Sequence, residues 1–209
     1  MSAIDGTTLD VPDTPAHRAG LGKRDNQYAT AGYPQIRLAA LVACGTRAII
    51  DAVFGPAARG EPTYAARLLR SLRSGMIVLL DRGLSSNGLL AAITGTGADF
   101  LARVTSARKP PVLRRLADGS FLSVLGGVTV RIIECPITIA TTAGTQTGIY
   151  RLATTLLDPR QHPAFELVKL YHQRWEIESA YFEIKKRCWP AASCAPAPCR
   201  ASPRRSTPC

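Results

Sequence analysis

The chain has 209 residues, of which 46% are hydrophobic, and this is enough apolar material to bury the core of one domain. Its formal net charge of +11 favours polyanionic partners such as nucleic acids, because neutralising phosphates is the sequence-independent part of nucleic-acid affinity. No apolar run approaches the roughly 18 residues of a membrane span, and the N-terminus has no signal-peptide core. These features exclude a membrane-spanning class and predict a cytoplasmic protein.

The first half of the chain alternates strand-like and helix-like segments. Short apolar or β-branched runs bounded by turn residues predict strands at residues 2–11, 35–44, 47–54, 76–80 and 100–104. The second and third of these are joined at Gly45-Thr46, as in a hairpin. The uninterrupted apolar run at 76–80 indicates a buried strand at the centre of a sheet.

Helices are predicted between these strands. Apolar residues recur at helical spacing from Ala65 to Leu72, with Gly75 just beyond as a C-terminal cap. A second helix is predicted at residues 86–94. The polar stretch 17–34 predicts a mobile loop.

Residues 107–148 have a different character. Proline and glycine pairs separate short β-rich pieces there, which predicts a β-rich insertion. Residues 151–157 predict one more strand, and Pro163 opens a long helix. We therefore expect a folded core at residues 1–186 and a tail at 187–209.

The tail has no sequence features of a folded segment. It contains five prolines and four cysteines but no Leu, Ile, Val, Met or Phe, so it cannot offset its ordering entropy by burying apolar surface. The cysteine gaps differ from those of a zinc site. The tail is expected to be disordered, and its residue types are those of GC-rich DNA translated out of frame. We hypothesise a frameshift near Lys186.

The segment from Tyr171 to Lys185 carries an unusual polar stripe. Tyr171, Arg174, Glu178 and Lys185 follow one another at gaps of three, four and seven residues. At roughly 100° per residue, an α-helix places all four within about 60° of one another. A carboxylate between Arg and Lys predicts a site for a metal and a phosphate. An apolar stripe lies beside it, made of Leu167, Leu170, Ile177, Tyr181 and Ile184.

The pattern Y-x2-R-x3-E-x6-K resembles the signature of bacterial transposases of the insertion-sequence-4 type. Two upstream segments resemble that family's other motifs in the same order: residues 3–9, which contain Asp5, and residues 77–83, which contain Asp81. The resemblance covers about residues 3–186. It implies a DDE catalytic domain of α/β class, with a ribonuclease-H-like mixed sheet flanked by helices and a β-rich insertion before the last catalytic helix.

The resemblance also implies a chemistry. Asp5, Asp81 and Glu178 would be the catalytic residues and the ligands of two Mg²⁺ or Mn²⁺ ions, which activate the attacking oxygen and neutralise charge on the phosphate. The reaction would be DNA strand cleavage followed by strand transfer. The DNA-binding residues would be Tyr171, Arg174 and Lys185. The partners would be double-stranded DNA of the transposon ends and target, in the bacterial nucleoid, and a second copy of the chain in full-length members.

Ordinary structural explanations remain open for each residue. Asp5 and Asp81 also suit strand-end turns, Arg174 and Glu178 a surface ion pair, and Tyr171 the core. Members of the family carry a DNA-binding region before the first strand, so we expect a catalytic core trimmed at both ends. A truncated, non-catalytic remnant that at most binds DNA is therefore the alternative function. A ribonuclease-H-like nuclease without specificity for DNA ends is a third.

Overall fold

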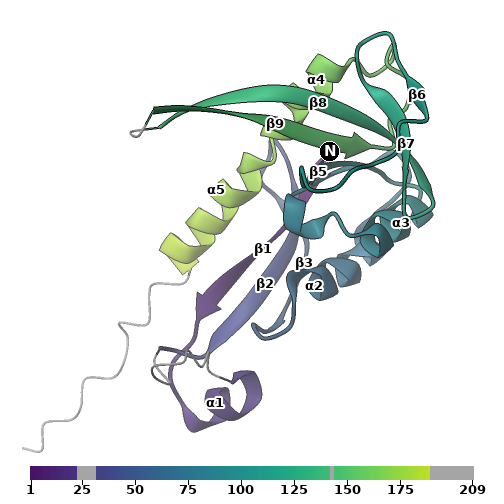
Figure 1. Cartoon of the computed structure of the whole chain (residues 1–209). Coiled ribbons are helices and arrows are strands. Elements are labelled where there is room, and N and C mark those ends of the chain that lie inside the picture. Colours follow the sequence, from purple (N-terminus) through teal and green to yellow (C-terminus); the bar gives the residue numbers. More distant parts are fainter. Residues whose placement is uncertain (23–31, 142–143, 189–209) are drawn as a thin grey trace, which may run out of the picture.

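The computed structural model describes residues 1–22, 32–141 and 144–188 (Figure 1). Its strands form one mixed sheet in the order β3-β2-β1-β4-β5-β9-β8-β7-β6. They are β1 (Ser2–Asp10), β2 (Gln35–Ala43), β3 (Ile49–Pro56), β4 (Ile77–Leu80), β5 (Asp99–Val104), β6 (Arg114–Arg115), β7 (Phe121–Leu125), β8 (Val128–Thr141) and β9 (Gly144–Thr154). The helices are α1 (Pro15–Leu21), α2 (Glu61–Leu68), α3 (Asn87–Gly95), α4 (Ala164–His172) and α5 (Trp175–Glu183).

Three parallel strands form the centre of the sheet. β4 pairs in parallel with β1 on one side and with β5 on the other. β2 and β3 extend the sheet beyond β1 as an antiparallel hairpin, and β9, β8, β7 and β6 extend it beyond β5. The two central connections, β4 to β5 and β3 to β4, each contain a helix, as parallel pairing requires.

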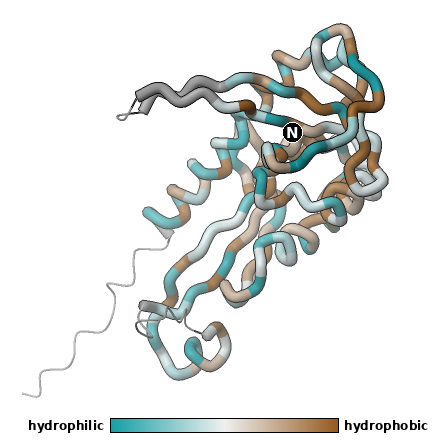
Figure 2. Tube along the Cα trace, in the orientation of Figure 1, coloured by the Kyte–Doolittle hydropathy of each residue, from teal (hydrophilic) through white to brown (hydrophobic). Residues whose placement is uncertain are grey.

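Helices cover both faces of the sheet, and each face has its own core. Successive strand residues point to opposite faces, so in β4 Val78 and Leu80 pack with α2 and α3, whereas Leu79 packs with α4 and α5. In β1, Ile4 likewise packs on the face of α2 and α3, and Ala3 packs on the face of α4 and α5. Figure 2 shows hydrophobic residues, in brown, along the strands and along the helices that pack on them. Residues buried on both faces explain why residues 76–80 form an uninterrupted apolar run.

Most predicted elements have close counterparts, and four differ. α1 lies partly in the predicted loop at 17–34, so that prediction is wrong for residues 17–21, while residues 23–31 lie outside the described ones. α1 buries no side chain, and it therefore has no apolar periodicity to detect. Its start is nevertheless encoded, because Thr14 accepts a hydrogen bond from His17 N and Pro15 occupies the first turn.

The helix predicted after Ala65 ends sooner than expected. α2 stops at Leu68, a 3-10 turn follows at Leu69–Ser71, and Leu72 is already extended. Gly75 has a φ of +80° and belongs to the turn that leads into β4, so it is not a helix cap. The predicted strand at 151–157 is also not separate, because it is the end of β9, which begins at Gly144.

The long helix predicted after Pro163 is divided into α4 and α5. Gln173 and Arg174 keep helical backbone angles, but their amides bond to Leu170 O and Tyr171 O in i to i−3 turns. A π-helical turn, Ile184–Cys188, follows α5. The i to i−3 turns and the π-helical turn both alter the rotation per residue. The positions calculated for the polar stripe on one ideal helix are therefore wrong in detail.

A buried arginine fixes the start of α4 relative to the β-rich region. Arg131 of β8 is fully buried and donates from Nε to Ser120 Oγ at 2.8 Å and from Nη1 to His162 O at 2.6 Å, and it forms an ion pair with Asp118. It thus joins the turn before β7 to the loop that precedes α4 (Figure 1). None of the helices in the described part of the chain is long and apolar enough to cross a membrane. The tail at 189–209 lies outside that part.

Candidate active site

The two motif aspartates follow corresponding positions of neighbouring parallel strands. Ile4 of β1 is paired with Leu80 of β4, so Asp5 and Asp81 come next on each strand. Their shared register places both at the carboxyl end of β4, on the face covered by α4 and α5. β4 ends there, and Asp81 starts a 3-10 turn, Arg82–Leu84. Asp81 is close enough to interact electrostatically with Asp5 and Arg174.

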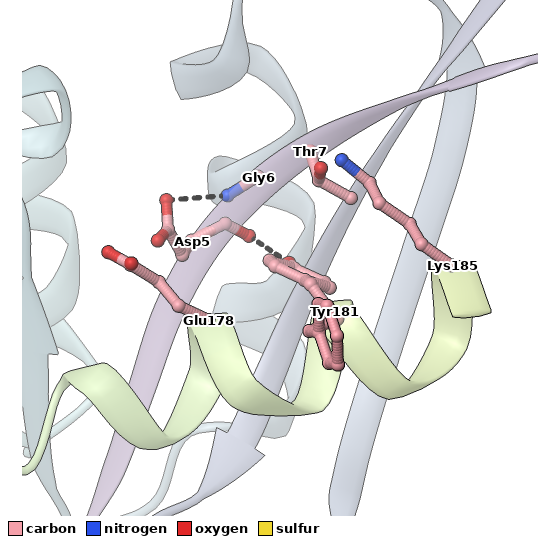
Figure 3. Close-up of a pocket in the computed structure, with 7 residues that line it drawn as sticks. Asp5, Gly6, Thr7, Glu178, Tyr181 and Lys185 are labelled. Carbon is pink, nitrogen blue, oxygen red and sulfur yellow. Dashed lines mark hydrogen bonds between the residues drawn. The ribbon is translucent and has the colours of Figure 1, made fainter. Parts of the chain in front are cut away.

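Glu178 approaches Asp5 from α5, across the face of the sheet (Figure 3). Arg174 joins the two: its Nη1 is 3.0 Å from Asp5 Oδ2 and its Nη2 is 3.0 Å from Glu178 Oε1. Arg174 is only 9% exposed as a residue. The i, i+4 pair of Arg174 and Glu178 is therefore extended to a residue 169 positions away, unlike a simple surface pair.

Two tyrosine hydroxyl groups hold α4 and α5 on the strands that carry the aspartates. Tyr171 donates to Leu80 O, directly before Asp81, at 3.1 Å. The hydroxyl of Tyr181 donates to Asp5 O and accepts from Ala40 N, so it bridges β1 and β2 at the position where Asp5 faces Ala40. Burial raises the pKa of both phenols, which keeps them neutral donors.

Tyr171 is more buried than we expected for a residue that binds a DNA phosphate. It is 5% exposed, and its ring packs edge-on against Tyr150 with centroids 5.7 Å apart. Its hydroxyl faces a backbone carbonyl in the core and lies beneath the carboxylates. A direct contact with a DNA phosphate is not available to it in this conformation, and the sequence could not distinguish a buried from an exposed phenol.

Lys185 lies at the far end of an open pocket of about 370 Å³. Figure 3 shows its side chain directed toward Thr7, while Asp5 and Glu178 lie at the other end of the drawn group. The pocket is lined by Asp5, Gly6, Thr7, Glu178, Tyr181, Phe182 and Lys185. Although the π-helical turn changes the helical register, Lys185 still opens onto the same pocket as Glu178.

Burial dominates the electrostatics of Asp5. It raises the pKa of this carboxyl group, and nearby Asp81 acts in the same direction. The Gly6 amide, which donates to Asp5 Oδ1 at 2.8 Å, and the Arg174 guanidinium oppose the shift. The folded protein therefore binds a proton at Asp5 more tightly than the unfolded chain does. This group contributes less to stability as the pH rises through its raised pKa.

A further carboxylate that no sequence pattern indicates, Glu61, lies at the site. It starts α2, and burial followed by repulsion from Asp5 raises the pKa of its carboxyl group. Its carboxyl carbon and Oε1 would be only 2.8 Å from a Cβ added to Gly6. A side chain at position 6 would therefore require the Glu61 carboxyl group to move. The nearby Gly60-Glu61-Pro62 run signals a helix start, but nothing in it indicates where that start lies relative to Asp5.

We expect Gly6→Ala to destabilise the protein by about 1–3 kcal/mol, because the new methyl group overlaps the Glu61 carboxyl group. Urea unfolding monitored by circular dichroism would measure this. Gly83→Ala is the matched control, because no atom lies within 4 Å of a Cβ at that position. Equal stabilities of the two variants would show that the close contact at Gly6 is relaxed at no cost.

The donor set suits a hard divalent cation. Asp5, Asp81 and Glu178 offer only carboxylate oxygens, the ligands that Mg²⁺ prefers. Within the described residues, no three acidic, histidine or cysteine side chains already surround one point closely enough to hold a metal. Arg174 supplies positive charge between Asp5 and Glu178 instead. The residues fit such an ion by the chemistry of their donor oxygens.

Comparison with known proteins identifies the family. Residues 1–194 match the family described as "Transposase DDE domain". The chain belongs to this DDE transposase family. It is 28% identical over 194 residues to "Transposase InsG for insertion sequence element IS4" of Escherichia coli, covering 89% of this chain and 44% of InsG. It is 30% identical over 100 residues to "Putative transposase InsZ" of the same organism, covering 47% of this chain and 33% of InsZ.

These matches confirm the resemblance to transposases of the insertion-sequence-4 type. The mixed α/β fold with helices on both faces is consistent with a DDE domain. The chain spans less than half the length of the curated relatives that it matches.

Proposed function

We propose that this chain is the catalytic domain of an insertion-sequence transposase, which cleaves DNA strands at the element ends and transfers them to a target. The observation that supports this most strongly is the geometry of Asp5, Asp81 and Arg174. Asp5 within β1, Asp81 directly after the neighbouring parallel strand β4, and Glu178 of α5 all lie at or near the guanidinium of Arg174. A structural role alone would not need carboxylates from three separate elements.

Asp5, Asp81 and Glu178 would hold the divalent cations, two per site. When bound, these cations activate the attacking oxygen and stabilise the charge that develops on the phosphate. Asp5 is the central carboxylate, because it interacts with Asp81 and lies on the Glu178 side of β1. Asp5 is held in position by the amide of Gly6 and by the Tyr181 hydroxyl on its own carbonyl.

Arg174 and Lys185 would bind DNA phosphates on either side of the carboxylates. Arg174 now binds Asp5 and Glu178, and a cation between those carboxylates would release its charge for a phosphate. Its Nε is buried and, among the described residues, has no hydrogen-bond partner, so one donor is already unused. Tyr171 is assigned a positioning role, because its hydroxyl fixes the backbone beside Asp81.

We expect Lys185→Ala to weaken DNA binding uniformly across sequences. The slope of log K against log salt concentration should fall by about 0.9, which corresponds to one lost phosphate contact. Fluorescence anisotropy at several salt concentrations measures this slope. Lys169→Ala is the control, because Lys169 lies on α4 with its ammonium 3.3 Å from Glu166. A slope unchanged from wild type would place Lys185 outside the DNA interface.

The partners would be double-stranded DNA of the element ends and the target, in the bacterial cytoplasm. A non-catalytic remnant that only binds DNA is the second candidate, since in the described residues no three acidic, histidine or cysteine side chains already surround one point closely enough to hold a metal. Nicking of a supercoiled plasmid that carries the sequences flanking the gene separates the two. The proposal predicts nicking with Mg²⁺ or Mn²⁺, none after EDTA treatment and none by Asp81→Ala. Folded protein that binds the plasmid without nicking it would be the remnant.

A further inference from the structure

Glu61 reaches Asp5 from the opposite side of the sheet to Glu178. It starts α2, which packs in the core on the face away from α5. Gly6 makes this approach possible, because a side chain there would occupy the space of the Glu61 carboxyl group, at 2.8 Å. The carboxyl groups of Glu61 and Asp5 therefore lie close enough to interact electrostatically.

The sheet is open at this point. β1 pairs with β4 only over Ser2–Ile4, and among the described strands it has no partner on that side beyond Ile4. α2 contacts both β1 and the turn that follows Asp81. Glu61 thus enters a notch in the sheet that Asp5 and Asp81 also border.

Its other contacts do not explain this position. The nearest atoms of Arg37 and Glu61, Nη1 and Oε2, are 3.8 Å apart, beyond hydrogen-bonding distance. An acidic residue at a helix start is favourable, but it needs no contact with another carboxylate. Two ionised carboxylates this close repel each other unless a shared proton or a positive charge compensates them, and here only Arg37 and Arg174 do so among the described residues.

We propose that Glu61 is a fourth carboxylate of the metal site, which faces the cation beside Asp5 from the side opposite Glu178. This inference rests on the proposed function, because it takes the cation at Asp5 from there. It adds an oxygen donor from α2, an element that carries none of the three family motifs. It also gives Gly6 a function, which is to leave room for this donor.

The test is Mn²⁺ binding to the full chain without DNA, measured by electron paramagnetic resonance of free Mn²⁺ during titration. We expect Glu61→Gln, which keeps the shape and removes the charge, to weaken binding about tenfold or more. Glu61→Asp, which keeps the charge but shortens the reach, should weaken it too, and serves if the glutamine variant does not fold. Glu166→Gln, at the Lys169 pair on α4, is the matched control and should bind as wild type.

Melting temperatures at pH 8 provide a second readout. Without metal, Glu61→Gln should melt higher than wild type, because repulsion of Asp5 is removed, and Mn²⁺ should raise its melting temperature less. If Glu61 is only a favourable helix-start residue, Glu61→Gln melts at a lower temperature than wild type and binds Mn²⁺ equally well. That result overturns the inference and leaves the proposed function intact. If wild type itself binds no Mn²⁺, both fail.

Discussion

Glu178→Gln is expected to abolish metal-dependent DNA nicking while DNA binding stays within about twofold of wild type. The amide keeps the shape of the side chain and can still accept from Arg174 Nη2, so α5 should remain in place. What it loses is the negative charge that would hold a cation opposite Asp5. Removing one group that stabilises the charge of the transition state costs on the order of a hundredfold to a thousandfold in rate, and loss of a metal ligand should cost at least as much.

Glu176→Gln is the matched control for this experiment. Glu176 lies two residues earlier on α5 and pairs with Arg47, away from the pocket. Its substitution makes the same change in net charge and should leave both nicking and binding unchanged. Nicking by Glu178→Gln at the wild-type rate would remove Glu178 from the catalytic residues and return it to an ordinary ion pair.

Arg174→Leu is expected to cost about 3–5 kcal/mol of stability at pH 8 in the absence of divalent cations, because it leaves Asp5 buried without its ion-pair partner. The cost should depend on pH. Asp5 has a raised pKa in the folded state, and loss of the guanidinium raises it further. Asp5 of the folded variant then binds its proton more tightly than Asp5 of the unfolded chain. The variant's stability deficit relative to wild type is therefore small below about pH 4, and it grows as the pH rises through the pKa of Asp5 in the folded variant.

Urea unfolding at several pH values between 4 and 8 would measure this stability deficit. The free energy of unfolding falls by about 1 kcal/mol or more per M urea, so the deficit appears as a shift of the unfolding midpoint. Arg59→Leu is the control, because Arg59 is exposed on the turn before α2. Added Mn²⁺ should restore part of the loss in Arg174→Leu, since a cation would take over the charge of the guanidinium. A deficit that is the same at every pH would mean that Arg174 contributes packing and not charge compensation.

The sequence predicted the parts of the site that depend on local patterns. An apolar run followed by an aspartate defines Asp81, and Asp5 follows a similar short run in β1. The two aspartates come together because β1 and β4 are parallel and Ile4 is in register with Leu80. Helical spacing grouped Arg174 with Glu178, which the structure bears out at 3.0 Å. The burial of Leu167, Ile177 and Tyr181 follows the predicted apolar stripe in the same way.

The parts that it missed depend on tertiary placement. Neither proline nor glycine marks the boundary between α4 and α5, so the division at Gln173 was not visible. The environment of Tyr171 depends on which strand α4 covers, and periodicity does not encode that. Glu61 lies 56 positions from Asp5, and only the packing of α2 against β1 brings them into contact.

Carboxylates of three distant segments would hold the divalent cations between them, and iron-directed cleavage of the protein chain tests this most directly. Fe²⁺ bound in place of Mg²⁺ and treated with ascorbate and peroxide releases hydroxyl radicals that cut the nearest backbone. We predict cuts close to Asp5, Asp81 and Glu178, suppressed by excess Mg²⁺ and absent in Asp81→Asn. Mass spectrometry would locate them. No cleavage of the folded wild-type protein, or cleavage confined to other segments, would contradict the account.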